Sequence, residues 1–384
     1  MTTRSVRLTL PELMTAMLAA AFVALGHASP AAANGHEPEG VTSGNGNIKL
    51  SVSGQVNRGV LYVDDGADEQ FFHVDNDNSS TRVRFVGSGS FSDDISVGTV
   101  VEVQFESNST ANIKMNQDSA TGDDNFTQRK LELYFDHKRY GRLWLGQGDT
   151  ASNGTSEVDL SGTGVIGYSG VADMAGGIEF QDTGGTGPSI GSTFSNMDGL
   201  SRDDRLRYDT PNLGGFKLSG SLIENGAADV ALRYNAAFGG FELVSALAYS
   251  SNSGRDKGPG DLGFSQINGS VSVHHDSGFN VTAAAGQRDL DDLARDEDPF
   301  FWYAKAGYKW GGGIGGTAIA FDYMQADDID EDNDEGVSYS VMLVQKIDKI
   351  ATDLYLGGRI YQLDRTDRNF DDVAAVMAGA RVKF

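Results

Sequence analysis

The segment WYAKAGYKW, residues 302–310, alternates between apolar and cationic side chains with a period of two residues. Its even-numbered residues are Trp, Ala, Ala, Tyr and Trp, whereas Lys305 and Lys309 stand at odd positions. Successive side chains of a β-strand point to opposite faces, so this segment predicts a strand with one apolar and one cationic face. Trp and Tyr at both ends of an apolar face are typical of a strand that crosses a bilayer.

The same alternation recurs along the chain. In STRVRFVG and RLRY, the pairs Arg82 and Arg84 and Arg205 and Arg207 lie opposite apolar residues. A cation that faces lipid at mid-membrane costs about 2–4 kcal/mol, so these arginines are expected to face the interior. Other charged residues in the same phase are Lys130, Arg233, Arg288, Arg359, Arg381, Lys383, Glu102, Glu106, Glu132 and Asp322. So many charges cannot be buried without water, and the pattern predicts an aqueous interior.

From residue 49 onward, nearly every segment predicts a strand, and most are close to the length that crosses a bilayer at a tilt. The candidate strands are 49–63, 80–91, 96–107, 129–138, 141–150, 205–211, 216–224, 229–238, 241–251, 266–275, 279–288, 300–310, 316–326, 336–347, 351–363 and 373–384. An even number of strands suits a closed antiparallel barrel, and sixteen strands enclose an aqueous channel. The sequence therefore predicts an all-β, sixteen-stranded transmembrane barrel.

Loop length alternates along the chain in step with strand number. The connections after even-numbered strands are brief, as at 92–95 and 239–240. Those after odd-numbered strands are mostly long, as at 151–204 and 327–335, with 225–228 as the exception. Outer-membrane barrels have short turns at one end and long loops at the other, whereas a β-sandwich has no reason to divide its loops in this way.

The N-terminus predicts export. Two arginines precede an apolar run at 13–25, and an A-x-A site ends at Ala33. The run is too short to cross a bilayer as a helix. We therefore expect a cleaved signal peptide over 1–33, a short segment over 34–48 and the barrel over 49–384.

The composition is strongly acidic, with 54 Asp and Glu against 30 Lys and Arg, and this argues against nucleic acid as a partner. There are no cysteines, so disulfides and thiolate metal sites are excluded. The acidic runs fall in the long loops, as at 327–335. They are either solvated loop tips or carboxylates that bridge through divalent cations to lipopolysaccharide phosphates.

The sequence offers no catalytic constellation. GTGVIG (162–167) matches a dinucleotide-binding motif by its letters, but no strand–helix pattern surrounds it. His73 is the one histidine in a predicted external loop, and no nucleophile accompanies it. We therefore expect no enzymatic activity, no cofactor and no metal site.

Four segments in combination resemble the general, non-specific porins of Gram-negative bacteria, in particular the alphaproteobacterial trimeric type. They are IKLSVSGQVNRGVLY (48–62), DNSSTRVRFVGSGSFSDDISVGTVVEVQFE (77–106), RKLELYFDHKRYGRLWLGQGDTASNG (129–154) and MAGARVKF (377–384). The resemblance covers about 47–384. It implies a homotrimer of sixteen-stranded barrels in outer-membrane lipid, which conducts small hydrophilic solutes passively. It also implies that the terminal aromatic, Phe384, is the signal read by the barrel-assembly machinery.

In the family that the sequence resembles, the third loop folds inward and narrows the pore, with its acidic groups facing arginines on the wall. Here that loop is 151–204. The candidates for this constriction are Arg82, Arg84, Arg205, Arg207 and Lys130 on the wall, and Glu157, Asp159 and Asp173 on the loop. The P-E-F-G-G-type motif of enterobacterial relatives is absent, so the choice among these carboxylates stays open.

The sequence thus predicts passive diffusion of ions and small polar solutes across an outer membrane. The acidic surplus favours a mild preference for cations, although most of it lies in external loops. One alternative is a channel selective for phosphate or other anions, which needs several cations converging on a narrow site. The other is an outer-membrane structural or adhesion β-protein with a plugged or absent pore.

Overall fold

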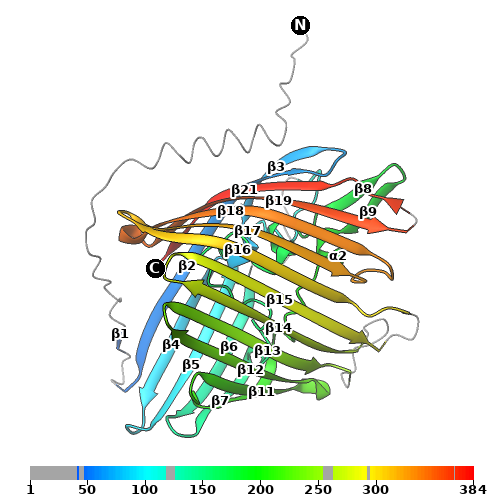
Figure 1. Ribbon diagram of the computed structural model, residues 1–384. Helices are drawn as coiled ribbons and strands as arrows, with labels where there is room; N and C mark the ends of the chain where they lie inside the picture. Colours follow the sequence, from blue (N-terminus) through cyan, green and yellow to red (C-terminus); the bar gives the residue numbers. More distant parts are fainter. Residues whose placement is uncertain (1–40, 43–46, 118–125, 254–262, 292–294, 367) are drawn as a thin grey trace.

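The computed structural model describes residues 41–42, 47–117, 126–253, 263–291, 295–366 and 368–384. They form a closed antiparallel barrel of 16 strands, as the sequence predicts (Figure 1). Around the ring the strands are β2 (Lys49–Asp64), β4 (Arg82–Ser90), β5 (Ile95–Phe105), β6 (Phe126–His137), β7 (Gly141–Asp149), β10 (Arg202–Asp209), β11 (Phe216–Ile223), β12 (Ala228–Phe238), β13 (Phe241–Ser251), β14 (Phe264–His275), β15 (Phe279–Leu290), β16 (Phe300–Gly312), β17 (Gly315–Asp327), β18 (Glu335–Ile347), β19 (Thr352–Arg365) and β21 (Val373–Lys383).

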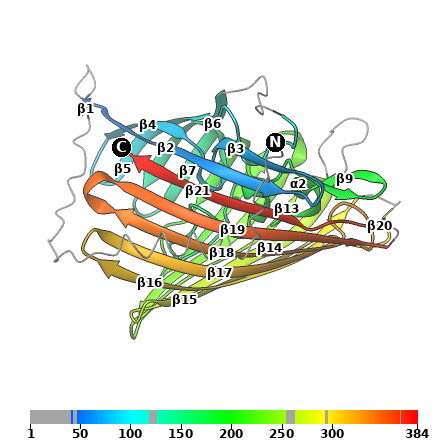
Figure 2. The same ribbon diagram turned by 90° about the horizontal axis from the view of Figure 1, so that it is seen from above.

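The ring closes between its first and last strands. β21 pairs with β2 from Lys383 opposite Gln55 to Ala374 opposite Asp64, and Figure 2 shows the two strands side by side. Gly54 and Phe384 then exchange two backbone hydrogen bonds of 2.8 and 3.0 Å. A closed ring leaves no unpaired strand edge, which is the condition for a sheet to cross hydrocarbon.

The outer face of the barrel carries the apolar half of the alternation. On β6, for example, Leu131 and Phe135 are 52% and 54% exposed, although both are large and apolar. Aromatic pairs lie near both ends of this face, such as Trp302 with Tyr323 and Phe279 with Tyr308. An exposed apolar band between aromatic girdles suits lipid rather than water.

The short elements lie mainly in the connections. β1 (Val41–Thr42) pairs with the start of β2, β3 (Glu69–Asp75) pairs with its far half, and β20 (Arg368–Asn369) pairs with the end of β19. The others are η1 (Asp77–Ser79), η2 (Val171–Met174), η3 (Glu224–Gly226), η4 (Asp348–Ile350), β8 (Glu179–Asp182), β9 (Gly185–Ser189) and α2 (Ile190–Thr193). None of the helices in the described ranges is long and apolar enough to span a membrane. The expected signal peptide over 1–33 lies outside the described residues.

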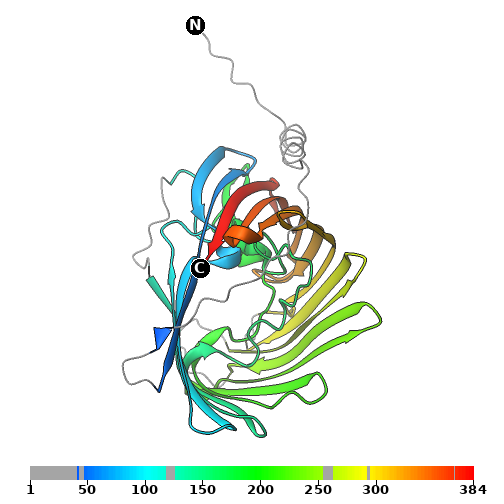
Figure 3. The ribbon, with the colours of Figure 1, turned by 90° about the vertical axis from the view of Figure 1, so that its left-hand side faces the viewer.

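The third loop, L3, is residues 150–201 between β7 and β10, and it folds into the barrel. In the view of Figure 3, L3 lies within the ring of strands, against the orange and red wall. Its apolar side chains and those of that wall form one buried cluster; the L3 members are Val165, Ile166, Val171, Met174, Ala175, Ile178, Phe180, Ile190, Phe194 and Met197. Full burial of a large apolar side chain stabilises a fold by about 1.5–3 kcal/mol, so this contact holds L3 firmly inside.

The expectation of an aqueous interior is therefore wrong for the part of the barrel that L3 covers. Arg359 and Asp322, which were assigned to the aqueous lumen, form an ion pair of 2.7 Å with side chains only 1% and 0% exposed. Arg359 also donates to the hydroxyl groups of Ser338 and Ser340, and Asp322 accepts from Ser340 and Tyr303. The polar atoms of the pair are therefore largely satisfied without water. The sequence pattern shows which face a residue occupies, but it does not show that a distant loop covers that face.

Candidate functional site

Polar side chains of the wall hold the backbone of L3 along its path. On β14, Ser270 Oγ donates to the Thr155 carbonyl at 2.7 Å, and Ser272 Oγ accepts from the Leu160 amide at 2.9 Å. Further along, Lys305 Nζ donates to the Gly167 carbonyl at 2.8 Å, and Tyr361 donates to the Val171 carbonyl at 2.7 Å. L3 therefore runs along the wall from β12 to β19.

The uncovered wall opposite carries a cluster of arginines. Arg82 and Arg84 lie two residues apart on β4, as predicted, and Arg82 is close to Arg129 of β6 and Arg202 of β10. Arg84 pairs with Glu102 of β5 and keeps 42% of its side chain exposed. Among the described residues the Arg82 side chain makes no hydrogen bond or ion pair, although Glu102 attracts it at longer range. These guanidinium groups therefore present positive charge to the lumen.

Arg129 reaches this cluster through a β-bulge. Lys130 lies opposite Glu102 and Gln128 lies opposite Val103, so Arg129 has no partner of its own in the ladder. A bulge leaves one extra residue and re-aims its side chain. As a result, Arg129 Nε donates to Glu102 Oε1 at 2.8 Å while the neighbouring Lys130 pairs with Asp149. Strict alternation would have placed one of these two cations in lipid.

Carboxyl groups of L3 and of the bases of the first two loops face this cluster. Asp173 of η2 and Glu157 lie on L3, Asp77 lies on η1, and Glu106 follows β5. Arg129 attracts Asp173 and Arg202 attracts Glu157. Within the described ranges, no ion pair joins the arginine cluster to a carboxylate of L3. The two groups therefore attract each other only at longer range.

Burial changes the protonation of these carboxyl groups. Burial, with repulsion by Asp198, raises the pKa of Glu157 to about 8. Burial, with repulsion by Asp77, raises the pKa of Glu106 to about 8 and that of Asp173 to about 7. Tyr168 donates to Asp173, and Asn196 donates to Glu157 at 3.1 Å. The acidic side of the gap is therefore only partly charged near neutral pH, whereas the arginine side stays charged.

Other residues predicted for the constriction have their charge compensated. Asp159 pairs with Lys305 at 2.7 Å, on the covered side of the barrel. Arg205 is 2% exposed and pairs with Glu132, and its Nη1 donates to the Gly146 carbonyl at 2.7 Å. These residues lie on the lumen side of the sheet, but their contacts hold L3 and the strands together rather than face the open lumen.

Sequence periodicity does not identify four residues of this region, namely Arg129, Arg202, Asp77 and Asp198. The lumen-facing position of Arg129 depends on the bulge. A charged residue next to Lys130, in the phase that should face lipid, is a sequence signal for such a bulge. Arg202 was placed in the loop because β10 begins earlier than predicted. Asp77 and Asp198 lie in loops, where periodicity gives no direction for a side chain.

Phe384 lies on the outer face, as expected from its phase with Val382. The two side chains are 58% and 45% exposed. The Phe384 ring lies over Gly54 of β2, where a β-carbon would come within 2.6 Å of it. Glycine at this position therefore makes room for the aromatic ring at the rim of the barrel.

The arrangement is a cationic wall across from a partly protonated acidic loop inside a closed barrel, and we call the space between them the L3 gap. Fixed charges of opposite sign across a narrow, low-dielectric passage create a strong transverse field. Such a gap can order water and sort solutes by charge and polarity.

Comparisons with known proteins agree with the barrel fold. The sequence profile of a family described as Gram-negative porin matches residues 15–368. No protein with a curated function matches the chain by sequence. Among solved structures, an anion-selective porin from Comamonas acidovorans has a TM-score of 0.61 and 15% identity over 88% of this chain and 100% of that one.

Two further structures share the fold. The trimer form of OmpT, an outer membrane protein of Vibrio cholerae, has a TM-score of 0.56 and 12% identity over 88% of this chain and 100% of that one. OmpF of Salmonella typhi, in complex with daunomycin, has a TM-score of 0.54 and 13% identity over 88% of this chain and 99% of that one.

Proposed function

We propose a selectivity site for this chain, which belongs to the Gram-negative porin family and is an outer-membrane channel for passive diffusion of ions and small hydrophilic solutes. The site is the gap between L3 and the arginine cluster. One observation carries the proposal. The Arg82 guanidinium, which has no ion-pair partner among the described residues, lies opposite a loop that is anchored across the barrel. The anchored loop keeps the passage narrow, and the free charges act on whatever passes.

The charge balance in this gap depends on pH. Arginines stay protonated throughout the physiological range, whereas the carboxyl groups of Glu106, Glu157 and Asp173 titrate near pH 7–8. Ion selectivity is therefore expected to shift toward anions as pH falls. The mild cation preference expected from composition stays a prediction, and the same recordings test it.

A homotrimer is part of the proposal. The fold is shared with a Vibrio cholerae protein whose structure is a trimer form, and trimers are implied by the sequence resemblance. Outer-membrane lipid, lipopolysaccharide and the barrel-assembly machinery are the other expected partners, the last through Phe384. The signal peptide over 1–33 is proposed to direct export.

We also propose that the chain catalyses no reaction, because it belongs to the Gram-negative porin family and buried lumen charges such as Arg359 with Asp322 and Lys305 with Asp159 are paired with each other. The acidic run of the loop before β18 supports a structural role over cation bridging. Arg365 pairs there with Asp330 and Asp334, and Arg295 pairs with Asp332. Those carboxylates already have cationic partners within the protein.

The experiment that tests the selectivity site is a reversal-potential measurement in a KCl gradient across a planar bilayer. The double variant Arg82→Gln/Arg84→Gln removes two positive charges from the lumen and should shift selectivity toward cations. The shift should weaken at high salt, because salt screens the fixed charges.

The matched control is Arg139→Gln, which removes one positive charge from an exposed turn between β6 and β7, outside the lumen. It should leave the reversal potential unchanged. An unchanged reversal potential for the Arg82/Arg84 variant at both low and high salt would place the selectivity site elsewhere. The absence of any conductance from folded protein would favour the adhesion alternative.

A further inference from the structure

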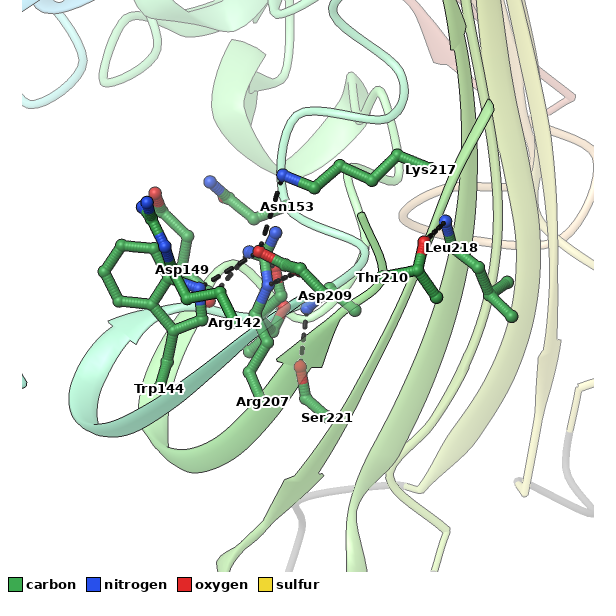
Figure 4. Close-up of polar contacts among 12 residues, drawn as sticks. Arg142, Trp144, Asp149, Asn153, Arg207, Asp209, Thr210, Lys217, Leu218 and Ser221 are labelled. Carbon is green, nitrogen blue, oxygen red and sulfur yellow. Dashed lines mark hydrogen bonds and ion pairs between the residues drawn. The ribbon is translucent and has the colours of Figure 1, made fainter. Parts of the chain in front are cut away.

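A second group of cations lies on the lumen face near the short-turn end of the barrel, outside the constriction. Arg207, Lys217 and Arg233 come from the consecutive strands β10, β11 and β12. Lys217 and Arg233 are direct cross-strand neighbours in the register of the sheet. We call these three residues the basic row. Figure 4 shows Arg207 and Lys217 pointing toward the same carboxylate, that of Asp209.

Asp209 is the carboxylate at the centre of the basic row, and it is covered. The Asp209 side chain is 3% exposed, and it accepts hydrogen bonds from Arg207 Nε at 2.8 Å and from Trp144 Nε1 at 3.0 Å (Figure 4). Lys217 Nζ is 3.7 Å away, an ion-pair distance beyond hydrogen bonding, and its side chain is 45% exposed. The lumen therefore meets the ammonium group rather than the carboxylate beneath it.

The two other carboxylates near Arg233 are occupied by the L3 backbone. Asp229 accepts from the amides of Ala151 and Ser152 at 3.2 and 2.8 Å. Asp198 accepts from the amides of Gly154 and Ser156 at 2.5 and 2.8 Å. These carboxylates still attract Arg233 at longer range, but their oxygens already serve to fix the loop.

Donors in the basic row remain without acceptors. Arg233 Nη2 donates to the Asn153 carbonyl at 2.8 Å, but its Nη1 is buried and has no hydrogen-bond partner among the described residues. Lys217 likewise makes no hydrogen bond through Nζ within the described ranges. Like charges directly opposite each other on neighbouring strands destabilise a sheet, and Arg207 adds a third positive charge. An anion beside the exposed Lys217 ammonium would relieve this repulsion and give that ammonium an acceptor.

We propose that the basic row is a binding subsite for the oxyanion group of permeating solutes, such as a phosphate or a carboxylate. An oxyanion matches the site because guanidinium and ammonium donors together suit several oxygens on one centre, whereas a halide offers only one atom. The subsite lies on the periplasmic side of the point where L3 leaves the wall. It would hold an anionic solute that has passed the constriction before it is released.

This inference requires that the barrel conducts, but not that the L3 gap selects, so the two can fail separately. Its test is the block of chloride current in single channels by inorganic phosphate added to the periplasmic side. Lys217→Gln should raise the half-inhibiting phosphate concentration by about tenfold, which is the loss expected for one charge-assisted hydrogen bond. Arg233→Lys keeps the charge but loses the planar fork, and it should give a smaller increase.

The matched control is Lys309→Gln, which removes a lumen-facing lysine near the same end of the barrel on β16, away from the basic row. Phosphate block should be unchanged in this variant. Equal block in wild type and Lys217→Gln, or an equal loss in Lys309→Gln, would overturn the proposal, as would a wild-type channel that phosphate does not block. Succinate in place of phosphate is the second arm: a Lys217-dependent block by only one of the two probes assigns the subsite to that class of oxyanion.

Discussion

Arg129 and Lys130 are consecutive in the sequence, yet both side chains form ion pairs on the lumen side of β6, with Glu102 and Asp149. Regular alternation would separate them to opposite faces. The bulge opposite Glu102 and Val103 brings them together, and so adds one guanidinium to the cluster that faces L3. A local irregularity in one strand thus supplies part of the charge that we propose governs selectivity.

The bulge can be tested by cysteine accessibility, because the chain contains no cysteine of its own. A water-soluble, membrane-impermeant thiol reagent should react with R129C and change the single-channel conductance. L131C is the control, since Leu131 is 52% exposed on the outer face. Its modification in detergent should leave conductance unchanged. If R129C behaves like L131C, Arg129 does not point into the lumen.

The selectivity of the channel should depend on pH between about 9 and about 6. The pKa of Glu106 and Glu157 is about 8 and that of Asp173 is about 7, so falling pH removes negative charge from the acidic side. The arginines keep their charge, and the reversal potential in a KCl gradient should move toward anions. Glu106→Gln/Asp173→Asn should flatten this dependence. The same pH profile in wild type and variant would show that other groups titrate.

Loss of the ion pair that anchors L3 should destabilise the barrel. Lys305 and Asp159 have side chains 0% and 10% exposed, so Lys305→Met leaves a carboxylate buried without its partner. Breaking a buried pair in this way costs about 3–5 kcal/mol. The temperature at which the band in SDS electrophoresis shifts from the mobility of the folded barrel to that of the unfolded chain should fall. The noise of the single-channel current should rise as L3 loosens.

The companion variant Lys305→Met/Asp159→Asn removes both charges and should recover most of that stability. The prediction fails if Lys305→Met unfolds at the wild-type temperature. Equal losses in the single and double variants would instead identify the hydrogen bond from Lys305 to the Gly167 carbonyl as the more important contact.

Phe384→Asp should lower the amount of protein in the outer membrane much more than it changes the conductance of each inserted channel. The side chain lies on the outer face and has no contact with the lumen. Phe216→Asp is the control, because Phe216 is a comparably exposed aromatic, at 46%, on the outer face of β11. Equal losses of yield would show a general effect of charge in lipid rather than a specific assembly signal.

The strands could be predicted closely from the sequence because each one alternates over its whole length and ends at turn-forming residues. β13 was predicted at 241–251 and is Phe241–Ser251, and β19 was predicted at 351–363 and is Thr352–Arg365. The division between short turns and long loops was equally visible, because it depends only on the spacing of strands.

What the sequence could not show is how distant segments meet. Arg359 and Arg84 have the same phase on their strands, yet one is buried beneath L3 and the other faces the lumen. The difference comes from the path of the loop, which depends on contacts such as that from Tyr361 to the Val171 carbonyl. Local periodicity contains no information about such a contact. For the same reason, the sequence identifies the acidic side chains of L3 as candidates for the constriction but does not show which of them lie there.

The way in which L3 is tied to the wall has a mechanical consequence. L3 is fixed to β12 through Asp229, to β14 through Ser270 and to β19 through Tyr361, and Asn76 at the base of the first loop binds it at the Val165 carbonyl. The loop thus acts as an internal brace that keeps the ring from collapsing. Shortening it to widen the passage would therefore also remove the support that keeps the passage open.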